Sequence, residues 1–193
     1  MRNVAILIFD EVEVLDFCGP FEVFAVTGAR SPGKPFQVFT VAENLTPITA
    51  RNGLSVNPNF SLADCPQADI LIIPGGYGTR PLLQNQVVID WIKEQASGAE
   101  LIMSVCTGAL LLAKAGLLEN LSATTHFNAM NELRKVAPNT QICPDQRIVD
   151  NGRILTSAGI SAGIDLSFHA VARLLGREAA QETARWMEYD YWK

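Results

Sequence analysis

The stretch 100-ELIMSVCTGALLLAKAGLL-118 decides the fold, because it places a cysteine between two runs of different character. Residues 100–105 form a short apolar run typical of a buried strand, whereas residues 107–117 are typical of a helix. Ser104 and Gly108 are small and stand two positions before and after Cys106. This spacing is typical of a nucleophile elbow, a sharp strand-to-helix turn that projects one reactive side chain.

Cys106 is therefore the candidate nucleophile. A thiol attacks as the thiolate, and the start of a helix favours negative charge, so the sequence predicts a lowered pKa for Cys106. The alternative is a small buried apolar residue, and we expect that role for Cys18, Cys65 and Cys143. The four cysteines lie far apart, with no C-x-x-C and no paired Cys/His spacing. We therefore expect reduced thiols and no metal site.

The rest of the chain alternates between strand and helix patterns. Apolar or alternating runs predict strands at 4–9, 36–42 and 70–73, and a short piece at 123–125. Two Asn-Gly turns predict hairpins at 47–57 and 146–156. Helices are predicted at 20–28, 87–96, 107–117, 128–136, 162–175 and 178–187. The alternation predicts a single α/β domain over 1–193, a three-layer sandwich whose doubly wound, mostly parallel sheet has helices on both faces.

Three loops are predicted at the carboxyl edge of this sheet, where the reactive crevice of such folds lies. They are residues 10–19, residues 74–79 and the turn at Cys106. In the second loop, Gly75 and Gly76 let the backbone approach the thiol, and the N–H groups of Gly76 and Thr107 are the candidate oxyanion donors. The segment lacks the Gly-Lys-Ser/Thr ending of a phosphate loop. A plain turn is the alternative interpretation.

Few groups are available to serve the thiol as acid or base. Asp16 stands between Leu15 and Phe17, so we expect it to be drawn inward near Cys106, with helix capping as the alternative. His126 is a candidate to line the site, whereas His169 is expected within a helix as a core or surface residue. Glu11 and Glu13 are expected to be solvated loop charges.

Charge and composition limit the classes of molecule that this chain is expected to bind. The chain has 193 residues, five net negative charges and no basic run, so nucleic acid and anionic lipid are not expected as direct partners. The longest apolar tract, residues 109–118, is interrupted by Lys114 and is too short to span a membrane. The N-terminal apolar run of six residues is followed by acids, unlike a secretory signal. We expect a cytoplasmic protein with a small-molecule substrate or ligand.

Taken together, these motifs resemble the ThiJ/PfpI superfamily, also called the DJ-one family, with its class I glutamine amidotransferase-like, flavodoxin-like fold. The resemblance runs through FDEVEVLDFCGPFEVF, ADILIIPGGYGTR, LIMSVCTGALLLAKAGLL, ATTHF and TSAGISAGIDL, in the family's order. LDFCGP, PGG, SVCTG and ATTHF are most similar to the isocyanide hydratase branch. That branch is close to the amidotransferase-like domain of AraC-type transcription regulators.

The resemblance implies a role for each candidate residue. Cys106 is the nucleophile, Asp16 its acidic partner and Thr107 a neighbour that helps to hold substrate. Gly75 and Gly76, with Thr107, form the oxyanion side of the pocket. Because Thr107 stands where the family's proteases and deglycases have a histidine, and Ala170 and Val171 follow His169, protease and amidotransferase activities are disfavoured.

The sequence departs from the hydratase branch at two places, and the resemblance also implies an interface between two copies of the chain. Cys18 replaces the usual threonine of the L-D-x-x-G-P loop, which places a second thiol near the pocket, and the chain stops at Lys193 without the longer hydratase tail. A homodimer is implied. The aromatic residues near the C-terminus either form an interface or pack on their own domain: Trp186, Tyr189, Tyr191 and Trp192.

Two functions remain open from the sequence. The first is a cofactor-independent isocyanide hydratase in which Cys106 attacks the substrate carbon and Asp16 handles the proton. The second is a sensor that binds a small metabolite or oxidises Cys106, without a DNA-binding domain of its own.

Overall fold

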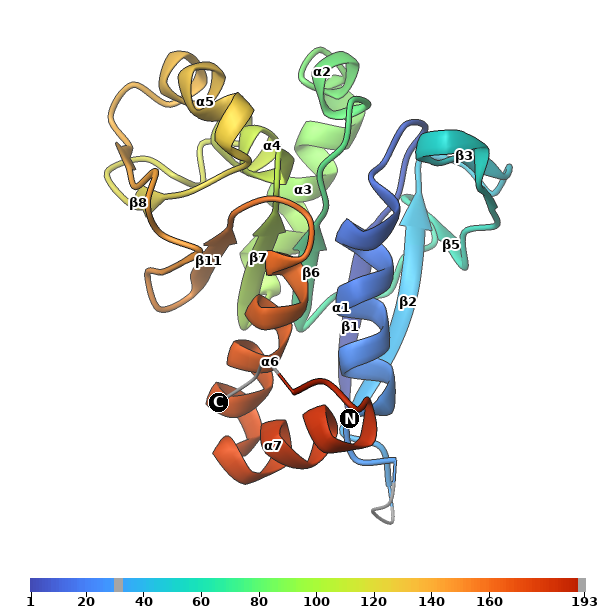
Figure 1. Cartoon of the computed structure of the whole chain (residues 1–193). Coiled ribbons are helices and arrows are strands. Elements are labelled where there is room, and N and C mark those ends of the chain that lie inside the picture. Colours follow the sequence, from blue (N-terminus) through green and yellow to red (C-terminus); the bar gives the residue numbers. More distant parts are fainter. Residues whose placement is uncertain (30–32, 191–193) are drawn as a thin grey trace.

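A seven-stranded sheet forms the centre of the computed structural model, which describes residues 1–29 and 33–190 (Figure 1). Its strand order is β10-β11-β7-β6-β1-β2-β5. The strands are β1 (Arg2–Leu7), β2 (Phe36–Ala42), β5 (Phe60–Ser61), β6 (Ile70–Ile73), β7 (Leu101–Val105), β10 (Ile148–Asp150) and β11 (Ile154–Ser157). All neighbours pair in parallel except β10 and β11, which confirms the predicted mostly parallel sheet.

The order of the strands places the functional edge. From β1 the chain moves outward to β2 and then returns to the other side of β1 with β6, so the direction of winding reverses between β1 and β6. Ligands of open α/β sheets bind outside the carboxyl ends of the strands at this reversal. The loops after β1, β6 and β7 meet at that edge.

Helices cover both faces of the sheet. On one face lie α1 (Val14–Val26) and α6 (Ala162–Leu175), and on the other lie α3 (Gln86–Gly98) and α4 (Gly108–Lys114), as Figure 1 shows. The helix α7 (Arg177–Trp186) packs beside α6 at the end of the molecule opposite the functional edge. This three-layer α/β arrangement confirms the predicted fold class.

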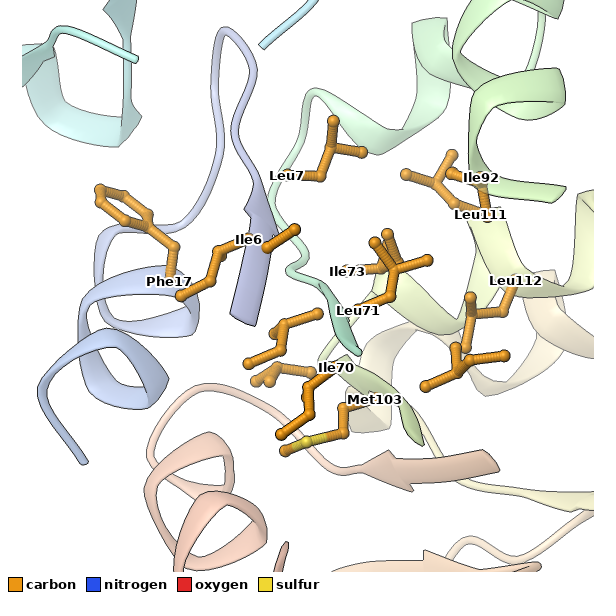
Figure 2. Close-up of a cluster of buried hydrophobic side chains, with 14 of the residues drawn as sticks. Ile6, Leu7, Phe17, Ile70, Leu71, Ile73, Ile92, Met103, Leu111 and Leu112 are labelled. Carbon is orange, nitrogen blue, oxygen red and sulfur yellow. The ribbon is translucent and has the colours of Figure 1, made fainter. Parts of the chain in front are cut away.

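The core explains why the strands read as continuous apolar runs. All four residues of β6 and all five of β7 are buried, because each strand has a helix layer on both faces. Figure 2 shows Ile70, Leu71 and Ile73 packed between side chains of α1 and those of α3 and α4. Burial of such side chains stabilises a domain by about 1.5–3 kcal/mol each.

Shorter elements surround the functional edge. The remaining elements are β3 (Ile48–Thr49), η1 (Arg51–Gly53), β4 (Ser55–Val56), α2 (Thr79–Leu82), β8 (Ser122–Ala123), η2 (Phe127–Ala129), α5 (Met130–Val136) and β9 (Gln141–Ile142). The predicted hairpins are confirmed as the antiparallel pairs β3–β4 and β10–β11. Three short pieces were not predicted, namely β5, β9 and α2.

The start of α1 differs from the prediction. The sequence places a helix at 20–28 with Pro20 in its first turn, but α1 begins at Val14 and holds Pro20 inside. A proline inside a helix lacks the N–H that would donate to the carbonyl four residues earlier, here that of Asp16, and its ring crowds the same carbonyl. The earlier start puts Asp16 in the first turn of α1 instead of in a loop.

No helix in residues 1–29 and 33–190 combines the length and the apolar character that a membrane span requires.

Candidate active site

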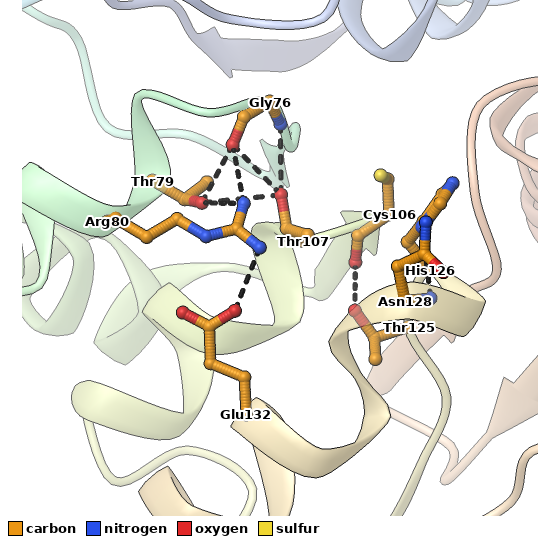
Figure 3. A network of polar contacts seen from close by, with 9 residues as sticks. All are labelled: Gly76, Thr79, Arg80, Cys106, Thr107, Thr125, His126, Asn128 and Glu132. Carbon is orange, nitrogen blue, oxygen red and sulfur yellow. Dashed lines mark hydrogen bonds and ion pairs between the residues drawn. The ribbon is translucent and has the colours of Figure 1, made fainter.

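Cys106 occupies a strained corner between β7 and α4. Its φ of 56° lies in the left-handed region, which a residue with a side chain adopts only where the surroundings impose it. The N–H of Cys106 donates to the carbonyls of Ser157 (3.2 Å) and Ala158 (3.3 Å). Its carbonyl accepts from the hydroxyl of Thr125 at 2.7 Å, as Figure 3 shows. These bonds hold the corner, and Cys106 as a whole is 5% exposed.

Asp16 reaches Cys106 because the loop after β1 is tied to the turn after β6. The N–H of Glu13 donates to the carbonyl of Gly75 at 2.9 Å, and Val12 bridges Gly76. The N–H of Gly75 then donates to Oδ2 of Asp16 at 3.0 Å. The Asp16 side chain is fully buried and lies close enough to the Cys106 thiol for each group to shift the pKa of the other, while Oδ1 of Asp16 has no hydrogen-bond partner among residues 1–29 and 33–190.

Gly76 is required for this junction. Its φ is 124°, and a Cβ there would lie 2.3 Å from the carbonyl oxygen of Glu11 and 2.5 Å from the nitrogen of Glu13. Only a residue without a side chain allows the two loops to approach so closely.

The electrostatics of the pair differ from the prediction. Burial raises the pKa of the Asp16 carboxyl to about 7, against the lowering effect of the Gly75 N–H. Burial and then the charge of Asp16 raise the pKa of the Cys106 thiol to about 12, whereas the N–H and hydroxyl of Thr107 act in the opposite direction. The predicted lowering of the Cys106 pKa is therefore wrong, because desolvation outweighs the start of α4.

The candidate oxyanion donors already have partners. The N–H of Gly75 is bonded to Asp16, and the N–H of Gly76 donates to Oγ1 of Thr107 at 2.9 Å. The N–H of Thr107 faces the sulfur. The oxyanion role of the two glycines stays a prediction, and it requires their present bonds to be exchanged for bonds to substrate.

A polar network supports Thr107 from the side opposite the thiol (Figure 3). The hydroxyl of Thr79 donates to the carbonyl of Gly76 at 2.8 Å, and Nη1 of Arg80 donates to the same carbonyl at 3.2 Å. Nη2 of Arg80 lies 2.8 Å from Glu132 on α5. The network therefore links the turn after β6 to a helix on the other side of the site.

A pocket of about 250 Å³ opens above Cys106. Among the predicted site residues, Gly76, Thr107 and His126 line it with the cysteine. Glu13 also lines the pocket and is half-buried, because the bond from its N–H to the carbonyl of Gly75 holds this loop against the site. The rest of the lining is Arg51, Tyr77, Arg80, Asn128, Ala129 and Ile160.

Sequence reasoning missed the two arginines and the tyrosine. Tyr77 and Arg80 follow Gly76 within four positions, so their place after the glycine turn was a usable signal. Arg51 had no such signal. It reaches the pocket from the β3–β4 hairpin, where its N–H donates to the carbonyl of Val12 at 2.9 Å.

Other predicted residues lie away from the pocket. Cys18 is on α1, is partly buried and is not part of the lining, so the second thiol is not beside the first. Cys65 and Cys143 are also partly exposed, not fully buried as predicted. His169 is on α6 and lies 2.7 Å from Asp150.

The aromatic end of the chain divides between packing and exposure. The ring of Tyr189 stacks on Phe168 with centroids 5.3 Å apart, whereas Trp186 is 55% exposed. Tyr191 and Trp192 lie outside the described residues.

Three comparisons with known proteins point to the same family. The model of the DJ-1/PfpI family matches residues 2–173. An isonitrile hydratase of Pseudomonas putida is 36% identical over 188 residues, which cover 97% of this chain and 78% of that protein. A crystal structure of a ThiJ/PfpI family protein from Pseudomonas syringae superposes with a TM-score of 0.89 at 29% identity, covering 98% of this chain and 75% of that one.

A transcription regulator also contains a similar segment. The HTH-type transcriptional regulator GbdR of Pseudomonas aeruginosa is 23% identical over 98% of this chain, but the chain spans only 51% of its length.

Proposed function

The chain belongs to the DJ-1/PfpI family, and from that premise we propose that it is a cofactor-independent enzyme that hydrates isocyanides through Cys106. The observation that carries this proposal is the buried pair of Asp16 and Cys106 at the base of a pocket. The 36% identity to an isonitrile hydratase supports the same chemistry.

The first step forms a thioimidate. Sγ of Cys106 attacks the terminal carbon of the isocyanide while Asp16 takes the thiol proton and passes it to that carbon. A C–S bond forms, and the product of this step is R–N=CH–S–Cys. The hydroxyl and N–H of Thr107 stand beside the sulfur and orient it.

The second step releases the product. Asp16 takes a proton from water as the water oxygen adds to the thioimidate carbon, and it gives that proton to the nitrogen. As the C–S bond breaks, the hydroxyl group of the intermediate loses its proton to Asp16, Asp16 returns this proton to the sulfur, and an N-substituted formamide leaves. The sum is R–NC plus water to R–NH–CHO, with the enzyme unchanged.

The raised pKa values of Cys106 and Asp16 indicate which group is the nucleophile and which is the base. Because the pKa of Cys106 is about 12, the thiol is not ionised in the resting protein at neutral pH. The attack therefore needs a base at the moment of reaction. A carboxyl group with a pKa of about 7 serves that need near neutral pH.

Hydration of a small alkyl isocyanide by the purified protein tests the proposal. We expect turnover in the wild type, loss of at least about a thousandfold in Cys106→Ala, and loss of a hundredfold or more in Asp16→Asn, a typical range for removing a nucleophile or general base. Cys143→Ala is the matched control and should retain full activity, because Cys143 lies outside the pocket lining. Absence of turnover, or equal activity in Cys106→Ala, contradicts the proposal.

A second candidate function is binding of a small molecule as a sensor. It is favoured by the match of 98% of this chain to half of a transcription regulator. Ligand binding in this pocket without any consumption of the ligand would distinguish the sensor from the enzyme.

A further inference from the structure

We infer that the substrate of this pocket carries a single negative charge, such as a carboxylate, and that the guanidinium groups of Arg51 and Arg80 bind it while Cys106 attacks. This inference rests on the proposed function, since it takes Cys106 as the reacting atom. It adds a class of substrate and the residues that select it.

The charge of the lining is opposite in sign to that of the chain. The whole protein has 20 acidic residues against 15 lysines and arginines. The pocket is lined by two arginines and by one carboxylate, that of Glu13. Two guanidinium groups against one carboxylate make cationic donors the main charged groups of the lining, and the carboxylates that pair with them, Glu11 and Glu132, lie outside it.

Arg51 is held in place with most of its donors free for a ligand. Its guanidinium lies over the ring of Tyr77, 4.2 Å from the centroid, and Nη1 lies 2.7 Å from Glu11, which is not part of the lining. Within residues 1–29 and 33–190, the bond to Glu11 is its one side-chain hydrogen bond. A guanidinium has five N–H donors, so it can still bind a carboxylate.

Arg80 presents a second guanidinium to the same pocket. Its Nη1 and Nη2 bond to Gly76, Thr79 and Glu132, which fix the plane of the group. Figure 3 shows this plane beside Thr107, the residue that follows Cys106. Planar guanidinium groups match the geometry of carboxylates, and fixed ones lose little entropy on binding.

Glu13 and the size of the pocket limit the ligand to one charge. A carboxylate in the lining repels a group with two negative charges, such as a phosphate monoester. The volume of about 250 Å³ suits a small organic molecule. A small isocyanide that bears one carboxylate therefore fits both the charge and the space.

Alkylation of Cys106 tests the charge preference without any turnover. Iodoacetate and iodoacetamide are similar in size, and with both the sulfur displaces iodide and forms a C–S bond. They differ in the negative charge of iodoacetate. The ratio of the two rate constants at Cys106, followed by peptide mass spectrometry, is compared with the same ratio for N-acetylcysteine amide.

We expect the ratio at Cys106 to exceed the reference by about fivefold, the effect of one charge at close range in a partly screened site. Arg51→Met, which keeps the apolar stem over Tyr77, should return the ratio to the reference. Arg134→Met, on α5 and outside the lining, is the matched control and should keep the wild-type ratio. A wild-type ratio at or below the reference, or an unchanged ratio in Arg51→Met, overturns the inference.

A second measurement tests anion binding in the pocket if neither reagent alkylates Cys106. Acetate and acetamide are titrated into the protein, and the amide resonances of Gly76 and Thr107 are followed by NMR. Shifts that saturate with acetate alone and vanish in Arg51→Met support the inference. Equal shifts with both compounds, or shifts that persist in Arg51→Met, contradict it.

The two proposals fail in different ways. If Cys106 prefers iodoacetate but no isocyanide is hydrated, the proposed hydratase function fails and the anion site stands. If neutral isocyanides are hydrated and the alkylation ratio equals the reference, the hydratase function stands and the anion site fails.

Discussion

A buried carboxyl group beside a buried thiol changes how each of them loses its proton. The pair of Asp16 and Cys106 binds two protons below about pH 7, and it binds one between about 7 and 12. The state with one proton is the state in which Asp16 accepts the proton of the attacking thiol. Catalysis should therefore depend on the ionisation of Asp16 and not on that of an isolated cysteine.

The first prediction at this scale concerns pH. We expect kcat/KM for isocyanide hydration to rise with pH, by about tenfold per pH unit below 7, and to level off above about 7 as Asp16 ionises. Initial rates across this range in the wild type give the profile. A profile that is flat through pH 7, or that rises only near pH 9, contradicts the role of Asp16 as the base.

The second prediction concerns stability. The folded-state pKa of Asp16 is raised from 3.8 to about 7, so the folded protein binds this proton more tightly than the unfolded chain does. The group therefore contributes full stability below about pH 4, and that contribution is lost as pH rises to about 7, by on the order of 4 kcal/mol. Asp16→Asn, which imitates the neutral acid, should be more stable than the wild type at pH 8.

Urea unfolding of Asp16→Asn and wild type at pH 8 and at pH 4 measures this difference. The gain should be several kcal/mol at pH 8 and close to zero at pH 4. Asp145→Asn is the control, because Asp145 is exposed and should change stability little at either pH. A less stable Asp16→Asn at pH 8 would show that the charged carboxylate is well solvated in the fold.

The sequence could predict which residues meet, but not the charge that they carry. The spacing of small residues around Cys106 and the apolar neighbours of Asp16 predicted a pair at one sheet edge. The pKa of the thiol depends on how completely both groups are buried, which the local sequence does not encode. Arg51 escaped notice because a hairpin distant in sequence delivers it.

At the scale of elements, the elbow is held by the segment after β8. Thr125 is the second residue after β8, and its hydroxyl supports the carbonyl of the strained Cys106. A carbonyl that loses its partner in a buried place costs about 1–3 kcal/mol. The left-handed conformation of Cys106 should relax when that support is removed.

The third prediction follows from this contact. Thr125→Val should lower the free energy of unfolding by about 1–3 kcal/mol and lower kcat/KM for isocyanide hydration by at least about tenfold, because the sulfur moves with the relaxed backbone. Thr140→Val is the matched control. Its buried hydroxyl also donates to a carbonyl at 2.7 Å, that of Leu118, but far from the pocket. Equal kinetic losses in both variants would contradict a specific role for Thr125.

A comparison of the predicted and observed helices and strands shows which sequence signals were sufficient to predict an element. Strongly apolar strands and Asn-Gly hairpins were predicted correctly because their signals are local. The start of α1 was not, since Pro20 is a strong signal for a first turn, and packing of α1 against α6 outweighs it. Two-residue strands such as β5 and β9 carry too few residues to show any period.

At the scale of the whole molecule, stability is concentrated in the middle of the sheet. The strand β6 is flanked by β1 and β7 and is covered on both faces, whereas the β3–β4 pair has two residues in each strand. Local opening is easiest where few buried contacts must break.

The fourth prediction is a gradient of hydrogen exchange. Amides of β6 and β7 should exchange at the rate of global unfolding, and those of the β3–β4 hairpin at least about a hundredfold faster. Exchange followed by mass spectrometry or NMR on the wild type gives both rates. Similar protection of the hairpin and β6 would mean that the hairpin is locked by further contacts, such as those of a homodimer.

The bonds from the Cys106 amide to Ser157 and Ala158 have a consequence for synthesis. These partners are about fifty residues downstream, so on the ribosome the cysteine is translated well before the backbone that bends it exists. Until β11 emerges and docks, the N–H of Cys106 lacks the two carbonyl partners that hold it in the folded protein. The bent backbone of Cys106 therefore forms only after β11 has been made, and a proteolytic fragment ending before β11 would carry the cysteine without the geometry that the proposed catalysis needs.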